Sequence, residues 1–353
     1  MALTAERSAP TRRTPSPAGR APARRTTPVL LLAGLALLLL VLASLAIGAR
    51  SIGFDTVLDA LTAYDPTSAD QLVVVTSRLP RTVLGLLVGA ALGLAGCVMQ
   101  GVTRNPLADP GVLGVNGGAA LAIVLGISVF GVSSVSGYVW FAFLGAAGAS
   151  VLVYSVAALG REGATPVKLA LAGAAVTAFF GAFTTALLLS DQSTFDQFRF
   201  WQVGSLNGRD LGVAARVLPF LLVGGVLALV LGRSLNSLAM GDDVARGLGA
   251  RVGLVRLGSA LAVVLLSGAA TAAVGPVGFV GLTIPHVART LVGNDYRRIL
   301  PASMLLAPVL LLAADVVGRV VARPGEVQVA IVTAVLGAPV FVALVRRHRL
   351  AGL

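Results

Sequence analysis

Very few ionisable side chains lie inside the long apolar segments of this sequence, and these are the residues that could do chemistry there. They are Arg216, His286, Arg289 and Asp315. An ionisable residue within a membrane is a functional candidate by default, so His286, next to Pro285, could relay protons. The alternative, which we favour, is an interfacial histidine that neighbouring backbone carbonyls satisfy near a helix break. Catalysis needs several convergent titratable groups, and this set is too small to predict a catalytic site.

The sequence lacks the residues that two further kinds of site would need. The chain has one cysteine, Cys97, and two histidines, which excludes an internal disulfide and leaves no plausible metal cluster. Its single lysine, Lys168, follows Pro166-Val167, so the sequence contains no GxxxxGK[ST] phosphate loop. We therefore predict that the protein is not an enzyme, needs no cofactor and does not hydrolyse ATP itself.

The elements that position these residues are long apolar segments. Of the 353 residues, 56% are hydrophobic and 12% are charged, and the mean hydropathy is +0.91. The charges cluster between apolar runs, which predicts an all-α polytopic membrane protein of about ten transmembrane helices. We expect a disordered basic cytoplasmic tail over residues 1–27 and one transmembrane domain over 28–349. The expected spans are 28–49, 82–102, 108–127, 138–159, 167–190, 211–232, 257–274, 276–293, 299–320 and 327–345.

The distribution of the basic residues predicts the orientation of the chain. The formal charge of +12 could suggest nucleic-acid binding, but most of the 27 Lys and Arg residues fall in alternate segments between the spans. Cytoplasmic segments are enriched in Lys and Arg, so this pattern places both termini in the cytoplasm. We therefore expect the protein to lie in the cytoplasmic (inner) membrane, where it contacts membrane lipid, and we expect no binding to nucleic acid.

The second expected span has an unusual face. Gly85, Gly89 and Gly93 recur every four residues, and Gly96 and Gln100 share their narrow sector of the helix. Small residues at this spacing let helix backbones approach closely within a membrane. The pattern predicts a central helix surrounded by other helices, although glycines alone are also compatible with generic membrane packing.

Motifs that flank this helix resemble those of a known family. RLPR at 78–81, GAALGLAGCVMQ at 89–100 and RNPLADPGVLGVNGGA at 104–119 are followed by a second block, GPVGFVGLTIPHVAR at 275–289. Together with GNDYRR at 293–298, Asp315 and Arg319, they resemble the iron-siderophore and cobalamin permease family of ABC importers. The resemblance covers roughly residues 29–346.

The resemblance implies a function and a set of partners. It implies the transmembrane permease subunit of an ATP-binding-cassette importer that carries a ferric siderophore, with cobalamin or haem as alternative substrates. The implied partners are a second permease subunit, two cytoplasmic ATPase subunits and an extracytoplasmic substrate-binding protein. An ion-coupled secondary transporter is a different reading, which the scarcity of carboxylates in the spans disfavours.

The resemblance also implies roles for named residues. Arg78, Arg81 and Arg319 would dock the binding protein, since arginine pairs with carboxylates in a bidentate manner. The alternatives are snorkelling of the arginines to the interface, and an i,i+4 ion pair between Asp315 and Arg319.

Segment 233–256 would form one or two short helices that couple to the ATPase, in contrast to an ordinary solvated loop. Its implied coupling residues are Asp242, Asp243, Arg246, Gly247 and Gly249. A last group is expected to have structural or translocation roles: Gly85, Gly89, Gly93, Gln100, Asn105, Pro106, Pro285 and His286.

Overall fold

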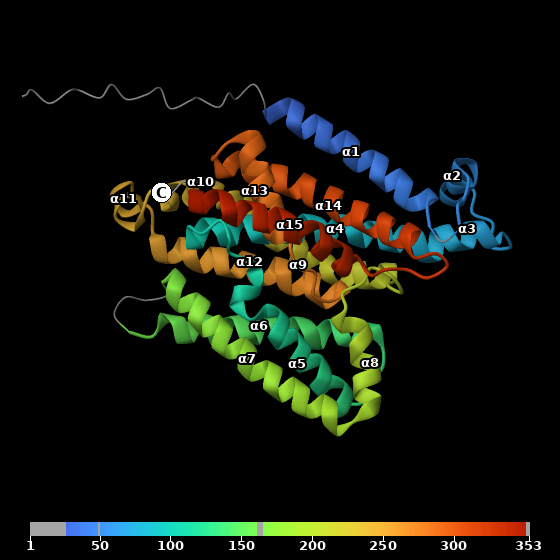
Figure 1. Cartoon of the computed structure of the whole chain (residues 1–353), viewed down its shortest axis with the longest axis horizontal. Coiled ribbons are helices and arrows are strands. Elements are labelled where there is room, and N and C mark those ends of the chain that lie inside the picture. Colours follow the sequence, from blue (N-terminus) through green and yellow to red (C-terminus); the bar gives the residue numbers. More distant parts are fainter. Residues whose placement is uncertain (1–25, 49, 161–164, 351–353) are drawn as a thin grey trace, which may run out of the picture.

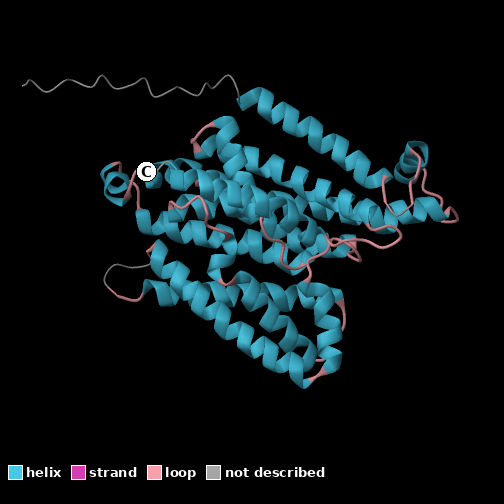
Figure 2. Cartoon of the chain, viewed as in Figure 1, coloured by secondary structure: helices cyan, strands magenta, loops and turns pink. Residues whose placement is uncertain are grey.

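The computed structural model describes residues 26–48, 50–160 and 165–350, and in these ranges every regular element is a helix (Figures 1 and 2). The prediction of an all-α protein is confirmed. The α-helices are α1 (Thr26–Ala46), α2 (Phe54–Thr62), α3 (Ala69–Val73), α4 (Leu79–Thr103), α5 (Val115–Ser128), α6 (Val135–Ala158), α7 (Pro166–Ser190), α8 (Gln192–Gln202), α9 (Leu211–Val230), α10 (Gly232–Ala239), α11 (Asp242–Gly247), α12 (Val252–Val274), α13 (Val280–Val292), α14 (Tyr296–Val321) and α15 (Val329–Leu350). A π-helical turn (Val74–Arg78) joins α3 to α4, and a 3₁₀ turn (Pro110–Leu113) precedes α5.

Seven of the described helices are long and apolar enough to cross a membrane: α1, the continuous run Ala69–Thr103, α6, α7, α9, α12 and α14. Two more apolar helices, α5 and the described part of α15, are shorter. Helix α13 has 13 residues, which span only about 20 Å of a hydrocarbon core about 30 Å thick. The eighth expected span, 276–293, is therefore a helix of about two thirds of the spanning length after a non-helical entry. The count of ten transmembrane helices stays a prediction.

The helices form two groups that meet at α12 (Figure 1). In the larger group, α4 packs against α9, α12, α13 and α14, while α1 and α15 lie against α14. In the smaller group, α5 packs against α6 and α7, and α8 crosses one end. We call the end that carries α2, α3 and α8 the α8 end, and the opposite end, which carries α10 and α11, the α11 end.

The two ends of the chain could be placed only in part. The expected tail, 1–27, lies outside the described residues except for Thr26 and Thr27, which begin α1. Helix α1 begins, and α15 finishes, toward the α11 end (Figure 1). Both ends of the described chain thus lie at the same end of the bundle, which agrees with an even number of crossings.

Two expectations about the segments between the spans were incomplete. The segment 50–77 lies between the first two expected spans, yet it folds into α2, α3 and the π-helical turn. The third expected span, 108–127, begins instead with the 3₁₀ turn, so its helix starts only at Val115. Asp109 is extended because it precedes Pro110, and Gly114 adopts a left-handed conformation with φ +73°, so no α-helix runs through either residue.

The glycine face of α4 is buried against neighbouring backbones, as the sequence predicted. A Cβ atom built at Gly89 would lie 2.6 Å from Pro308 Cα of α14. One at Gly93 would lie 2.6 Å from the carbonyl oxygen of Ser303, also in α14, and one at Gly96 would overlap the backbone of Gly281 in α13. The small residues therefore set the distance between α4 and the two helices that carry the second motif block.

Candidate docking and coupling sites

The three arginines expected at the docking face belong to a buried ionic cluster at the α8 end. Arg81 forms a bidentate contact with Asp315 of α14: Nη2 donates to Oδ1 at 2.7 Å and Nε donates to Oδ2 at 3.1 Å. Its Nη1 donates to Glu326 Oε2 at 2.7 Å. Arg319 donates to Oδ2 of Asp315, which confirms the i,i+4 pair. One carboxylate thus joins α4 to α14.

The same cluster holds the end of α1. Arg319 Nη1 donates to the Ser44 carbonyl at 2.8 Å and Nη2 donates to the Ser44 hydroxyl at 2.8 Å. Arg78 Nη1 donates to the Leu45 carbonyl at 2.7 Å. Because α1 ends at Ala46, these guanidinium groups satisfy carbonyls that have no partner within the helix. The arginines therefore fasten α1 to the central helices.

Burial changes how a docking role has to be understood. Arg78, Arg81 and Arg319 are between 2% and 4% exposed. Their guanidinium groups are not in water, so snorkelling does not describe them. In this conformation a binding protein would reach them only if it exchanged these internal bonds for its own. The sequence motifs identified the arginines but did not predict the contact between Arg81 and Glu326, which lie 245 positions apart.

The expected coupling segment protrudes from the α11 end. It consists of α10 and α11, joined at Met240-Gly241 and followed by Gly249, and the two glycines adopt φ values of +110° and +82°. The expectation of one or two short helices in this segment is confirmed, and α11 ends at Gly247. Gly241, rather than the Asp pair, precedes α11, so Asp242 and Asp243 lie in its first turn.

Large apolar side chains at the tip of this segment face solvent. Met240 is 64% exposed, Leu248 is 63% exposed, and Val244 between them is also exposed. Spaced four residues apart, they share one side of the segment. Arg246 and Asp243 form an exposed i,i+3 pair beside them. An apolar tip with a charged rim is typical of a protein contact surface.

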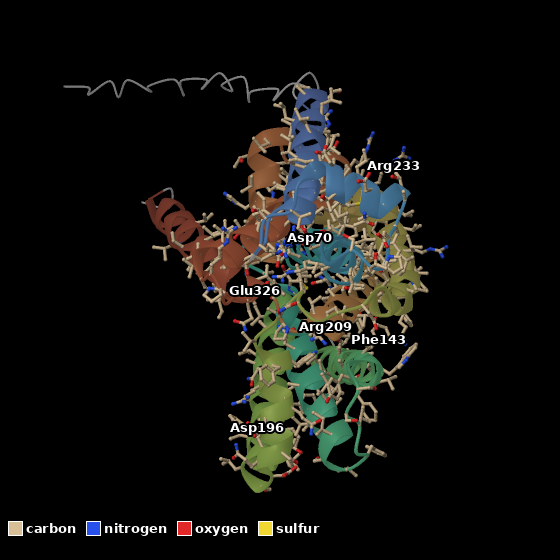
Figure 3. The ribbon with its side chains drawn as sticks, turned by 90° about the vertical axis from the view of Figure 1, so that its right-hand side faces the viewer. Asp70, Phe143, Asp196, Arg209, Arg233 and Glu326 are labelled. Atoms are coloured by element: carbon tan, nitrogen blue, oxygen red, sulfur yellow. The ribbon has the colours of Figure 1, made fainter. Side chains whose placement is uncertain are left out.

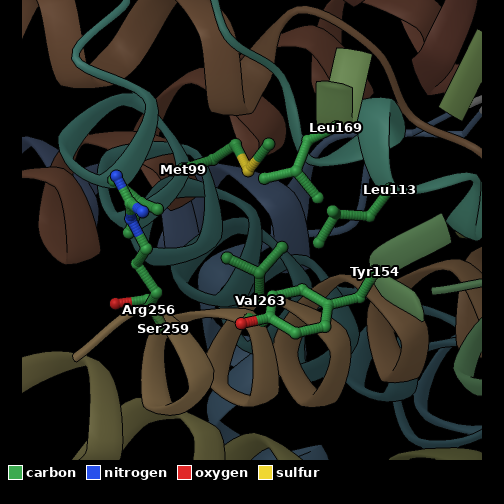
Figure 4. Close-up of a pocket in the computed structure, with 9 residues that line it drawn as sticks. Met99, Leu113, Tyr154, Leu169, Arg256, Ser259 and Val263 are labelled. Atoms are coloured by element: carbon green, nitrogen blue, oxygen red, sulfur yellow. The ribbon is translucent and has the colours of Figure 1, made fainter. Parts of the chain in front are cut away.

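Asp242 anchors the coupling segment to the bundle. Its Oδ2 accepts a hydrogen bond from Arg256 of α12 at 2.8 Å, and its Oδ1 pairs with Arg104 at the end of α4. Arg256 and Ser259 lie beside a small cavity lined by Met99, Leu113, Tyr154, Leu169 and Val263 (Figure 4). A movement of α11 would therefore pull on both central helices, α4 and α12.

A second link ties α10 to the start of α14. The Asn236 amide donates to Asp295 Oδ1 at 2.6 Å and accepts from the Tyr296 amide at 2.9 Å. Burial opposes ionisation of Asp295, but the hydrogen bonds from Asn236 and from the Arg297 amide outweigh it and hold its pKa below the usual range. Asp295 is thus an ionised cap of α14 that also fixes α10.

Most of the residues expected in structural or translocation roles converge near the same end. Gln100, Pro106 and His286 line a cavity of about 390 Å³ with Arg104 and Arg289. Gln100 Nε2 donates to the Leu282 carbonyl at 3.0 Å, and its Oε1 accepts from Arg289.

Two neighbours of this cavity have local structural roles. Pro285 lies within α13 and cannot bond to the Gly281 carbonyl, which lies 3.5 Å from Gln100 Nε2. Asn105 closes a turn by accepting from the Leu107 amide. The motif residues thus join α4 to α13 around a basic cavity.

Comparison with known proteins places this architecture in a family. The FecCD transport family model matches residues 36–347. The chain belongs to the FecCD transport family. It is 49% identical to the ferric enterobactin transport system permease protein FepD of Escherichia coli (strain K12), over 90% of this chain and 95% of the relative. It is 42% identical to the Fe(3+)-citrate import system permease protein YfmD of Bacillus subtilis (strain 168), over 87% and 90%.

Two further matches extend this FecCD assignment. The iron(3+)-hydroxamate import system permease protein FhuB of Bacillus subtilis (strain 168) is 42% identical, over 91% of this chain and 84% of the relative. A solved structure, described as an inward-facing conformation of a metal-chelate type ABC transporter, matches with a TM-score of 0.78 at 29% identity. That match covers 91% of this chain and 99% of the other. The family resemblance seen in the motifs is confirmed, and the chain has the fold of an ABC transporter permease.

Proposed function

We propose that this FecCD protein is the permease subunit of an ABC importer that carries a ferric siderophore or a similar metal chelate across the cytoplasmic membrane. The coupling segment is the observation that carries the proposal. Its exposed apolar tip, Met240, Val244 and Leu248, needs a protein partner, and Asp242 connects that tip to the two central helices. The α11 end then faces the cytoplasm and the α8 end faces outward.

Two ATPase subunits are the proposed partners at the α11 end. The chain has no phosphate loop of its own, so ATP must be hydrolysed by another protein. An ATPase that closes on ATP would displace α11, and the Arg104–Asp242–Arg256 bridge would pass this displacement to α4 and α12. Asp243, Arg246, Gly247 and Gly249 lie at the contact itself.

The substrate-binding protein is assigned to the α8 end. Arg78, Arg81 and Arg319 lie beneath this surface, where they hold α1, α4 and α14 in register. In our proposal the acidic groups of the binding protein compete with Asp315 and Glu326 for the arginines. Docking would then weaken the contacts of the buried cluster, so that the arrival of the loaded binding protein changes the contacts of α4.

A second permease subunit is assigned to the apolar face of α7. Helix α7 is the least covered of the seven long spans and exposes Leu171, Phe179 and Phe183. The native Cys97 is buried, so a Phe183→Cys variant would carry one accessible thiol. Cross-linking between two copies through this thiol, in native membranes, would support a symmetric pair. Cross-linking that is equally efficient from Leu144→Cys, exposed on α6, would assign the contact to random collision.

Uptake in cells tests the function. Cells that lack this chain should lose the uptake of radioactive iron supplied as a ferric siderophore, and cells that lack the partner ATPase should lose it equally. Haem and cobalamin are the matched substrates for comparison, and the 36% identical hemin transport system permease protein HmuU of Yersinia pestis makes haem the stronger of these alternatives. Normal siderophore uptake with lost haem uptake would replace the proposed substrate by haem.

A further inference from the structure

A polar cavity at the α8 end has no role in the function described so far. It has a volume of about 310 Å³ and lies between the start of α6, α8 and the segment 203–209. Its wall includes Tyr138, Gln197, Trp201 and Arg209, together with Ser133, Ser205 and Asn207. Figure 3 looks at this end of the molecule, with Arg209 near its centre. Among the residues that the structure describes, no carboxylate lines the cavity.

Arg209 is a cation without a counter-ion in the described part of the chain. It makes no hydrogen bond or ion pair there, and its Nε is buried without an acceptor. Burial lowers its pKa, and the Tyr138 hydroxyl only partly opposes this effect. The acidic residues nearest to it in the sequence are engaged elsewhere, since Asp210 caps α9 through the Val213 amide and Asp196 pairs with Arg199. An arginine stays protonated even so, and a partly desolvated guanidinium favours an anion.

A second donor at the same cavity also lacks an acceptor. Trp201 is 2% exposed, and its indole Nε1 has no hydrogen-bond partner among the described residues. Indole nitrogen only donates, and buried donors are nearly always bonded. The Tyr138 hydroxyl is held in place by the Ser133 carbonyl at 3.1 Å and by Gln197 Oε1 at 3.0 Å. One cavity thus collects a cation and an unsatisfied neutral donor with no negative group.

We propose that this cavity is an anion subsite that receives an acidic arm of the metal chelate at the outer face, so that the transporter favours negatively charged chelates. The inference rests on the proposed function. The volume suits one arm, because a cavity of about 150 Å³ already holds a benzene ring. Three catecholates or several citrate carboxylates leave an iron(III) complex negative, whereas three hydroxamates leave it neutral. The named relatives include both citrate and hydroxamate systems, so similarity alone does not choose between these classes.

Transport selectivity is the first test. The complete transporter, with its ATPase and binding protein, takes up radioactive iron as a tris-catecholate complex or as a neutral tris-hydroxamate complex. Arg209→Gln should raise KM for the negative complex about tenfold or more, because a hydrogen bond to a charged group is lost. Uptake of the neutral complex should not change, and Arg209→Lys should restore part of the affinity. Arg199→Gln, at an exposed arginine of the same end, is the matched control. Equal losses for both complexes would overturn the inference.

Direct binding is the second test, and it does not depend on transport. In the purified transporter with Trp140→Phe, Trp201 is the only tryptophan of this chain. A second version that also carries Trp201→Phe gives the fluorescence of the partner subunits, and subtracting it isolates the fluorescence of Trp201. Sodium citrate should change its emission with a saturable curve that Arg209→Gln abolishes, against sodium chloride at matched ionic strength. The same curve in both proteins would overturn the subsite.

The two tests also separate the subsite from other outcomes. A wild-type transporter that imports neither complex, yet shows the citrate curve, would contradict the proposed importer and leave the subsite standing. Weaker affinity for the substrate-free binding protein in Arg209→Gln, with selectivity unchanged, would assign the cavity to an acidic side chain of that protein and overturn the inference.

Discussion

The contact between α4 and α14 at Gly89 gives a prediction whose size follows from the structure. In a Gly89→Ala variant the methyl carbon would lie 2.6 Å from Pro308 Cα and 2.7 Å from Pro308 N. Non-bonded carbon atoms prefer about 3.5–4.0 Å, so the two helices must separate by about 1 Å. The obstacle is backbone, which cannot rotate away as a side chain could. Overpacking of this kind costs about 1–3 kcal/mol.

A control variant separates this contact from helix propensity. Replacing glycine by alanine stabilises a helix by about 0.8–1.0 kcal/mol, which offsets part of the cost at Gly89. At Gly34 of α1, a Cβ would have no neighbouring atom within 4 Å, so Gly34→Ala should show only the gain. The difference between the two variants should therefore be about 1–3 kcal/mol in the free energy of unfolding.

Reversible unfolding of the purified protein in detergent measures this difference, and transport shows whether the spacing matters for function. Gly89→Leu should be less stable than Gly89→Ala and should lose uptake, because a longer side chain has to displace the same backbone. Equal stability of Gly89→Ala and Gly34→Ala, with normal uptake in Gly89→Leu, would refute the close packing of α4 on α14.

Three further predictions follow from the ionic and coupling contacts. In Asp315→Asn, Arg81 and Arg319 lose their shared buried counter-ion, so the free energy of unfolding should fall by about 3–5 kcal/mol. In Asp70→Asn, which breaks the exposed Arg50–Asp70 pair, it should fall by about 1 kcal/mol or less, and unfolding in detergent compares the two variants. Arg246→Glu breaks only an exposed ion pair, and Gly249→Pro replaces a residue with φ +82°. Both variants should reduce ATP-driven uptake while the protein stays inserted and folded, and full uptake in both would show that the coupling contact lies elsewhere. Binding-protein affinity should fall with salt, and Arg78→Glu with Arg81→Glu should abolish it, with partial rescue by acid-to-Arg changes on the binding protein; a flat salt response would limit these arginines to their structural role.

Repeating patterns in the sequence predicted the helices and the central role of α4. The four-residue glycine spacing marked the face that meets Pro308 and Ser303, because periodicity is a local property. The short helices of segment 233–256 were also predicted. The late start of the third helix was not, since the 3₁₀ turn after Pro110 interrupts an apolar run that is continuous in the sequence.

Contacts between distant segments were beyond sequence reasoning. Arg81 and Glu326 are brought together by the packing of α4 and α14, and neither residue carries a local sign of the other. The arginines were recognised as a motif, but their burial depends on where α1 ends. The cavity around Arg209 was missed because its wall combines residues of α6, α8 and the segment 203–209, and no sequence pattern links these segments. Phe198 and Trp201 are buried, and Trp201 forms part of the cavity wall.

The central claim is that ATP hydrolysis by a separate subunit drives transport through this chain. Proteoliposomes can be prepared that contain the permease with or without the ATPase. Loaded binding protein is added on the outside, and the energy source is either ATP or a proton gradient. We predict uptake of the ferric siderophore only when the ATPase and ATP are both present, and loss of this uptake in Arg246→Glu. Uptake driven by the proton gradient without the ATPase would contradict the account.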